Sequence, residues 1–369
     1  MRIDFGGKLV AEKQIRAGSI GCGSHSFRNV YPTFQFAPVE LVATCDLDGA
    51  KAQAFARQFG AERAYDDHRR MLDSEDLDAV FIVTGYDQAG RPLYPGLAVD
   101  CLRAGCHVWM EKPPAASCAE LEKVAEAAEQ SGKHVLVGMK KMFAPANEKA
   151  KELMAGEEFG RPALVMLQYP QYVPSAEEFR AYIERASPSA AMGFLDHICH
   201  PASLMVFLAG IPRSLYYERA SDGSAVAVFG FESGVVGSIA LTRGASLNCG
   251  MERTTIVSDS GRHITVENNL RVTYHRLPGL SYGDTPSFYA GSPAEAAAVW
   301  EPEFSLGQFY NKGLFLLGYF GEVNEFARAI LEGRPPRKGT LDQAWQVTRI
   351  FEAFAEGPRN TIMLPQLSP

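Results

Sequence analysis

The sequence predicts an α/β domain with a doubly wound parallel sheet, followed by an α+β domain with a mainly antiparallel sheet. Between Ile15 and Gly138, short β-branched runs alternate with longer amphipathic stretches, which is typical of βαβ units around a parallel sheet. After about Pro145 the pattern changes to long segments with a period of two, as in antiparallel strands. A length of 369 residues also exceeds what one hydrophobic core usually supports, so two domains are expected.

The parallel sheet is expected to contain strands that alternate with helices. The strands have the sequences IRAGSI, VELVATC, AVFIVT, HVWM and HVLVGM, in this order along the chain. Residues 48–59 and 117–131 place Ala, Leu, Val and Phe at helical spacing, with charged and amide side chains on the opposite face. These helices are therefore expected to cover the sheet.

The antiparallel strands are expected in segments such as PALVMLQYP, SAVAVFGF, GVVGSIALTR, TTIVSD, HITVENN and LRVTYHRL. Near the end of the chain, LFLLGYFGEVNEFARAILEG and LDQAWQVTRIFEAFAEG are amphipathic and predict two helices. Residues 334–337 contain two prolines, which keep this linker non-helical. Residues 278–303 are rich in Gly, Ser, Pro and aromatics and predict a loop whose role the sequence leaves open.

The composition is typical of a globular protein of the cytoplasm. A net charge of −7 argues against nucleic acid as a partner, because that partner normally requires a clustered basic face. The seven cysteines are odd in number, lie mostly in apolar runs and form no CxxC pair, so reduced and buried thiols are expected. The N-terminus lacks the apolar segment of a signal peptide, and no stretch of about 20 uncharged apolar residues follows. Neither export nor membrane insertion is expected.

A glycine-rich turn follows the first predicted strand. It reads Gly21-Cys22-Gly23-Ser24-His25-Ser26, a GxGxxG pattern in which Ser26 replaces the third glycine. The first glycine permits a tight turn, the second lets a pyrophosphate approach backbone N–H groups, and Ser26 is small enough for close helix–sheet packing. A glycine turn without a ligand is the alternative, but a strand before it and a helix after it favour dinucleotide binding. The cofactor-binding residues predicted from this turn are Gly21, Gly23, Ser24, His25 and Ser26.

Asp46 ends the next predicted strand, about 20 residues beyond the glycines. A carboxylate at this place accepts hydrogen bonds from the adenosine ribose and repels a 2′-phosphate, which favours NAD over NADP. The alternative is that Asp46 caps the following helix, although Asp48 is better placed to do so.

A further motif, Glu111-Lys112-Pro113, ends a later strand. Together with the glycine turn, the CDLD strand end and the later GFLDHICH, it resembles the Gfo/Idh/MocA family, which includes glucose–fructose oxidoreductase and inositol dehydrogenase. The resemblance runs from about Ile15 to the last helices. It implies a Rossmann domain, placed at residues 1–142, and a domain with a large open sheet, placed at 143–369, which binds substrate and often forms the subunit interface.

The resemblance also implies roles for individual residues. Lys112 would reach the nicotinamide end of the pocket and hydrogen-bond the reacting hydroxyl, Glu111 would help to hold the cofactor, and Thr84 is expected to contact it. The Lys112–Pro113 bond is often cis in such proteins, and a cis bond would turn the lysine off the strand end. The alternative for Lys112 is a solvated lysine at a strand end.

Asp196 and His200 lie four residues apart, near the start of an apolar helix that is expected to run to about Leu208. A neutral imidazole can accept the hydroxyl proton as the hydride leaves, and a carboxylate can orient the lysine. In the family such a pair sits opposite the lysine. The alternatives are a helix N-cap for Asp196 and a buried structural histidine for His200. Metal binding is not expected, because His197 and Cys199 point to other helix faces.

The substrate pocket departs from the family pattern. Tyr94 stands where relatives have a histidine, and Met142 stands at a frequent arginine position, so the substrates of relatives do not transfer. Lys140 and Lys141 border the predicted cleft and are candidates to bind a hydroxyl, a carboxylate or a phosphate, with a solvated loop as the alternative. Two aromatic residues are candidates for stacking on a sugar, with simple packing as the alternative. They are Trp300 in the predicted loop and Tyr319 in the penultimate helix.

The sequence thus predicts an NAD-dependent oxidoreductase that transfers a hydride between nicotinamide and a carbinol carbon of a sugar, cyclitol or sugar derivative. A homodimer or homotetramer is expected, because segments of the second domain are apolar in more than one register. Two alternatives remain open. One is a catalytically silent NAD-binding sensor or corepressor, and the other is a glycoside-cleaving enzyme that uses NAD for transient oxidation. The sugar, the carbon oxidised and the direction are not predicted.

Overall fold

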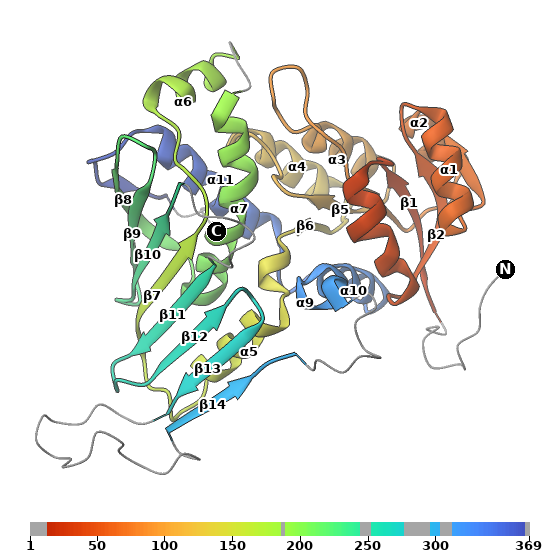
Figure 1. The fold of residues 1–369 in the computed structure, drawn as a ribbon. Coiled ribbons are helices and arrows are strands. Elements are labelled where there is room, and N and C mark those ends of the chain that lie inside the picture. The colour runs from red at the N-terminus through yellow and green to blue at the C-terminus, as the bar shows by residue number, and fades with distance from the viewer. Residues whose placement is uncertain (1–12, 186–188, 244–251, 277–295, 303–311, 366–369) are drawn as a thin grey trace, which may run out of the picture. The chain divides into compact units, whose positions relative to one another are not determined.

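The computed structural model describes residues 13–185, 189–243, 252–276, 296–302 and 312–365 (Figure 1). The chain forms two compact units. The first contains the chain up to Phe143, Arg185 and a return segment, Gly318–Thr348. The second contains Ala144–Glu184, the chain from Ser189 to Leu317, and the chain from Arg349 onward. The predicted division into residues 1–142 and 143–369 remains a prediction. It did not foresee the return segment as part of the first unit.

Within the described ranges, the first unit is built on a six-stranded sheet in which every pairing is parallel. The strand order is β3-β2-β1-β4-β5-β6, so the order reverses between β1 and β4, where ligands of doubly wound sheets bind. All five predicted strands are present, and β3 was missed because it has only three residues. The strands are β1 (Ile15–Ile20), β2 (Val39–Cys45), β3 (Arg63–Tyr65), β4 (Ala79–Ile82), β5 (His107–Glu111) and β6 (Val135–Gly138).

Helices pack on this sheet, and one of them comes from the C-terminal part of the chain. Phe81 and Trp109 are fully buried in the sheet, and the Phe81 ring meets Phe326 edge-on with ring centroids 5.5 Å apart. Phe326 belongs to α10 (Tyr319–Leu331), which contacts β1, β5 and β6. The other helical elements are η1 (Ser26–Val30), η2 (Tyr31–Gln35), α1 (Gly49–Phe59), α2 (His68–Ser74), α3 (Tyr94–Arg103), α4 (Cys118–Ser131) and η3 (Lys140–Met142).

The second unit is built on a sheet in which the described residues form nine strands, in the order β14-β13-β12-β11-β7-β10-β9-β8-β15 (Figure 1). Only the pairing of β7 with β10 is parallel among these strands, which confirms the prediction of a mainly antiparallel sheet. The strands are β7 (Pro162–Tyr169), β8 (Pro212–Arg219), β9 (Ala225–Phe231), β10 (Val236–Leu241), β11 (Arg253–Ser258), β12 (His263–Glu267), β13 (Arg271–His275), β14 (Ala297–Trp300) and β15 (Ile362–Met363).

The prediction of a loop over residues 278–303 is wrong at its C-terminal end. Ala297–Trp300 form β14, which pairs with β13 through main-chain contacts that the local composition does not reveal. Residues 277–295 and 303–311 lie outside the described ranges.

Helices cover one face of the second sheet. α5 (Pro145–Met154) contacts β12 and β13, and α7 (Ser189–Ala209) contacts β7 and β10. The remaining helices of this unit are α6 (Ala176–Ile183) and α9 (Lys312–Leu316), and α11 (Leu341–Ala355) belongs to the first unit up to Thr348 and to the second from Arg349. Among the described residues, α7 alone is long and apolar enough to cross a membrane by length and composition, and 67% of its apolar window is buried, as in a core helix.

The other face of this sheet carries exposed apolar side chains. Leu164 of β7 pairs with Val236 of β10, and Ser238 of β10 pairs with both Met166 and Val228. These apolar residues therefore point to one face. Their exposed fractions, together with that of Val226, lie between 37% and 52%. A contiguous exposed apolar face of this kind is typical of an interaction surface.

Candidate active site

The glycine turn has the geometry that the sequence predicts. Gly21 has a φ of +103°, and a Cβ at this residue would lie 2.0 Å from the carbonyl oxygen of Val83, so only glycine fits. A Cβ at Gly23, by contrast, has no heavy atom within 4 Å and would enter open space. A bound pyrophosphate requires such an open approach to the backbone. The turn therefore fits a dinucleotide.

Ser26, besides being small enough for close packing, forms a hydrogen bond within the turn. Its side chain is fully buried, and its hydroxyl donates a 2.8 Å hydrogen bond to the carbonyl oxygen of Gly21. Ser26 also begins η1, a short π-helix. The hydroxyl thus ties the start of the helix to the turn, a contact that a third glycine would lack.

Asp46 lies against the same turn. One carboxylate oxygen accepts a 2.8 Å hydrogen bond from the backbone N–H of Cys22, and the other accepts one of 2.9 Å from that of Asp48. Asp48 is the residue that caps α1, through bonds from Ala50 N and Lys51 N. The capping alternative for Asp46 is therefore wrong, as the position of Asp48 predicted. An ionised carboxylate has about four acceptor sites, so contact with a ribose remains open as a prediction.

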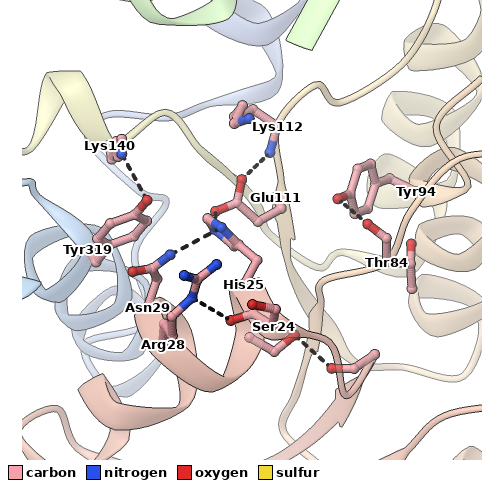
Figure 2. Close-up of polar contacts among 12 residues, drawn as sticks. Ser24, His25, Arg28, Asn29, Thr84, Tyr94, Glu111, Lys112, Lys140 and Tyr319 are labelled. Atoms are coloured by element: carbon pink, nitrogen blue, oxygen red, sulfur yellow. Dashed lines mark hydrogen bonds and ion pairs between the residues drawn. The ribbon is translucent and has the colours of Figure 1, made fainter. Parts of the chain in front are cut away.

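A hydrogen-bonded chain joins the turn to the end of β5 (Figure 2). Asn29 donates from its amide to Nδ1 of His25 at 3.1 Å, so Nδ1 is the acceptor and Nε2 carries the hydrogen. His25 Nε2 then donates to Oε1 of Glu111 at 2.9 Å. The second oxygen of Glu111 accepts from the backbone N–H of Lys112, also at 2.9 Å. The Lys112–Pro113 bond is cis, as the resemblance implies.

Both carboxylate oxygens of Glu111 therefore accept a hydrogen bond, and Glu111 is only 3% exposed. Lys112 takes part in further interactions within the protein. Lys112 itself is half-buried, and its role at the site remains a prediction.

Lys140 and Tyr319 form a second contact at this place. The ammonium of Lys140, in η3, donates a 2.8 Å hydrogen bond to the hydroxyl of Tyr319, at the start of α10 (Figure 2). The Tyr319 ring also meets the His25 ring edge-on, with centroids 5.7 Å apart. Tyr319 is buried in this structure, and its contact with a sugar remains a prediction.

Both lysines of η3 are withdrawn from solvent. Burial, followed by the charge of Lys141, lowers the pKa of Lys140 to about 8. Lys141 is only 5% exposed. The alternative of a solvated loop is therefore wrong for Lys141, while Lys140 is half-buried and bonded to Tyr319. The sequence does not indicate that a lysine is buried.

Thr84 follows β4, beside the point where the strand order reverses. Its carbonyl oxygen accepts a 2.7 Å hydrogen bond from the hydroxyl of Tyr94, which begins α3 (Figure 2). Its own hydroxyl is buried and has no hydrogen-bond partner among the described residues. Tyr94 thus holds the backbone just after β4.

Glu322 was not predicted as a site residue. It lies on the buried face of α10 with Tyr319, Val323 and Phe326, and it is fully buried. Neither carboxyl oxygen has a hydrogen-bond partner among the described residues. Burial, and next the Glu111 carboxylate, raise the pKa of Glu322 well above its usual value, whereas Lys140 and Lys112 oppose this shift. The sequence did contain a signal for this residue, because an acid among the apolar positions of a predicted helix is unusual.

In the second unit, Asp196 and His200 lie inside α7, which begins at Ser189 rather than near residue 193. The N-cap alternative for Asp196 is therefore wrong. Asp196 lies 3.8 Å from His197, from Oδ2 to Nε2, and the His200 ring lies 6.2 Å from that of Tyr169 between centroids. Burial, followed by the charges of Glu252 and Asp196, raises the pKa of Tyr169. The catalytic roles of Asp196 and His200 remain predictions.

Trp300 belongs to β14 and not to a loop, which corrects the prediction for its surroundings. The Lys149 ammonium lies 5.0 Å from its ring centroid. Across the described parts of the chain, no group of three or more His, Cys, Asp or Glu residues is arranged to hold a metal ion. The described cysteines are buried and form no disulfide with one another, and Cys249 lies outside the described ranges.

Comparisons with known proteins agree with this geometry. Residues 15–139 match the family described as an oxidoreductase family with an NAD-binding Rossmann fold, and residues 147–264 match the GFO/IDH/MocA C-terminal domain. The D-xylose 1-dehydrogenase (NADP(+)) 2 of Haloferax volcanii is 26% identical over 92% of this chain and 96% of its own length. The inositol 2-dehydrogenase of Salmonella typhimurium is 29% identical, over 41% of this chain and 44% of its own length.

Two solved structures share the fold. A dehydrogenase from Chromobacterium violaceum has a TM-score of 0.77 at 23% identity, covering 94% of this chain and 96% of its own. An oxidoreductase from Agrobacterium radiobacter, solved with NAD+, L-tartaric acid and magnesium, has a TM-score of 0.74 at 12% identity, covering 95% and 98%. The dehydrogenase class predicted from the sequence is confirmed by the family matches and the named relatives. The chain belongs to the Gfo/Idh/MocA family of oxidoreductases.

Proposed function

We propose that the protein is an NAD-dependent dehydrogenase or reductase that transfers a hydride between nicotinamide and a carbinol carbon of a sugar, a cyclitol or a sugar derivative. One observation carries the proposal. His25 of the open glycine turn bonds Glu111, and Glu111 accepts from the backbone of Lys112, so one hydrogen-bonded chain links the cofactor turn to the lysine at the strand end. Relatives named for D-xylose and for inositol support the substrate class.

The cofactor is proposed to rest on the turn, with its pyrophosphate against the backbone near Gly23 and its ribose hydroxyls at Asp46. A bound nicotinamide supplies the carbon that accepts or gives up the hydride. The negative charge of Asp46 disfavours a 2′-phosphate, which supports NAD. The relative from Haloferax volcanii is named for NADP, so both NAD and NADP have to be tested with this protein.

The protein's own residues are proposed to handle the proton of the substrate. Hydride leaves a carbinol carbon only as the hydroxyl proton is removed, so the site requires a base and a stabilising charge. We assign the base to His200, the binding of the hydroxyl and the developing alkoxide to Lys112, and the orientation of the lysine to Asp196. Lys140 and Tyr319 are proposed to contact the substrate's other oxygens, because their bonded pair lies beside His25.

An absorbance screen at the NADH band tests the proposal. Purified protein is given NAD+ or NADP+ with D-xylose, D-apiose, inositols, sugar acids and other sugars, and a Lys112→Ala protein serves as the inactive control. We expect NADH to form with at least one polyol and not with the control. Tight NAD binding without turnover on any substrate would favour the silent sensor, and release of an aglycone without net NADH would favour the glycoside-cleaving enzyme.

Assembly and location are proposed on two further observations. The exposed apolar face of the nine-stranded sheet, with Leu164, Met166, Val226, Val228 and Val236, supports a homodimer or homotetramer in which this face is covered. The described cysteines, which are buried and form no disulfide with one another, support a reducing compartment, the cytoplasm.

A further inference from the structure

Glu322 is a buried acid that the proposed chemistry does not use. A carboxylate without any hydrogen bond is strongly disfavoured inside a protein, so a fully buried carboxyl group normally keeps its proton. Both oxygens of Glu322 lack partners among the described residues, while every other residue of the buried stripe named above, Tyr319, Val323 and Phe326, is aromatic or aliphatic. An apolar residue would pack at this position without leaving buried polar atoms unpaired, so packing does not explain why an acid is present.

Charged groups of the candidate site surround Glu322. Glu322 interacts electrostatically with Glu111 and Lys112, which were predicted at the cofactor, and with Lys140, which was predicted to border the cleft. Glu322 lies one helical turn from Tyr319, which binds Lys140. The titratable groups that face this place come from the end of β5, from η3, from the turn before η1 and from α10 itself. Glu111, Lys112 and Lys140 act on Glu322 itself, and Lys141, His25 and Tyr319 act on or bond these three groups.

We propose that Glu322 is a charge-compensating positioning residue, neutral in the free protein and in the NADH complex, which loses its proton when the positively charged ring of NAD+ enters beside Lys112. The O–H bond of the carboxyl breaks, the electron pair stays on the carboxylate, and the proton passes to the buffer. A nicotinamide ring carries one positive charge when oxidised and none when reduced, so the two cofactor states differ by the charge that one carboxyl group balances. The reduced ring leaves Glu322 protonated.

The direction of the pH dependence follows from linkage. A group whose pKa falls on binding gives up a proton to the medium, so the affinity for NAD+ rises with pH until the free protein has also lost that proton. The affinity for NADH lacks this dependence. For a fully released proton the ratio of the two affinities changes by up to about tenfold per pH unit. Burial lowers the pKa of Lys140 to about 8, so about one pH unit below that value Lys140 is still roughly nine-tenths protonated, and the comparison with E322Q corrects for its remaining contribution.

The first experiment tests the protonation state without cofactor. Infrared difference spectra compare the wild type with E322Q, in which a neutral amide of similar shape replaces the acid. The matched control is E325Q on the same helix, because Glu325 is paired with Arg334 at 2.7 Å and its pKa is lowered by that partner against the opposing effect of burial. We expect E322Q to lose the carbonyl band of a protonated carboxyl and E325Q to lose a carboxylate band. Loss of a carboxylate band in E322Q would overturn the proposal.

The second experiment measures protons released on binding, by calorimetric titration of NAD+ and NADH in buffers of different ionisation enthalpy. We expect the wild type and E325Q to release more protons with NAD+ than with NADH, by up to about one proton. We expect E322Q to lose this difference while still binding NADH. An unchanged difference in E322Q would refute the role of Glu322.

The design separates this inference from the proposed function on which it rests. If the wild type binds neither NAD+ nor NADH, the proposed function fails and the compensating role fails with it, although the infrared result still reports the state of Glu322. If E322Q does not fold, Glu322→Met, which fills the apolar stripe without a polar group, serves the same titrations. If Glu322→Met weakened the affinities for NAD+ and NADH equally and kept the difference in released protons between them, Glu322 would have only a structural role. That result would contradict the proposal.

Discussion

Gly21 and Gly23 form a matched pair in which the same substitution should damage different properties. In Gly21→Ala the new Cβ would lie 2.0 Å from the Val83 oxygen and 2.7 Å from the Val83 carbonyl carbon. Val83 cannot withdraw easily, because its N–H donates to the Ile20 carbonyl at 2.8 Å. A positive φ costs a residue with a Cβ about 1–2 kcal/mol, and overlap in a packed region costs about 1–3 kcal/mol more. We therefore expect the free energy of unfolding to fall by about 2–5 kcal/mol.

Gly23→Ala should behave in the opposite way. Gly23 has no positive φ, and its Cβ would meet no atom within 4 Å, so the free energy of unfolding should stay within about 1 kcal/mol of the wild type. The methyl group would instead occupy the space through which the pyrophosphate approaches. We expect the Kd for NAD to rise at least about tenfold, which is about 1.4 kcal/mol.

The assays are urea unfolding followed by circular dichroism, and calorimetric titration with NAD. The reasoning would be refuted if Gly23→Ala bound NAD as the wild type does, because the open space at Gly23 would then not be the cofactor's approach. It would equally fail if Gly21→Ala were as stable as the wild type, because the turn would then have room that the structure does not show.

The remaining predictions concern the cofactor, the chemistry and the assembly. Asp46→Asn removes a negative charge but keeps an acceptor, so the affinity for NADP+ relative to NAD+ should rise at least about tenfold in calorimetric titrations; an unchanged ratio would contradict the role of Asp46. His200→Ala should lose about 10²–10⁴-fold in kcat with cofactor affinity nearly intact, and Lys112→Ala at least as much, in NADH absorbance assays. Normal turnover in His200→Ala would make Lys112 the preferred base. Val228→Glu should convert a sedimenting oligomer into a folded 40.3 kDa monomer; a wild type that is already monomeric would rule the interface out.

Local patterns predicted the first unit well. The run IRAGSI followed by two glycines specifies a strand and a turn within a few residues, and the structure has both. The same holds for the helices after Asp48 and Ser117, whose extents follow from periodicity, although only Asp48 caps its helix through a side-chain hydrogen bond. β3 was missed because three residues are too few to show an alternating pattern. β14 was missed because its own residues do not indicate that it pairs with β13.

The parts of the site that depend on distant contacts could not be predicted. The sequence left a solvated loop open for Lys140 and Lys141, and it does not show the packing of η3 with α10 or the burial of Lys141. Tyr319 was assigned to the second domain, yet it belongs with the first unit and bonds Lys140. Hydrophobic periodicity identified the helix that carries Tyr319 but gave no information about the sheet on which that helix packs.

The return segment Gly318–Thr348 has a consequence for how the protein is made. The ribosome completes the six parallel strands early, but α10, which covers β1, β5 and β6 and carries Tyr319, is synthesised only after the whole chain from Ala144 to Leu317. At usual rates of synthesis this delay is on the order of ten seconds or more. During that interval the apolar surface that Phe326 later covers is exposed in the nascent chain. Chaperone binding to ribosome-bound chains is therefore expected to be strongest between the emergence of β6 and that of α10.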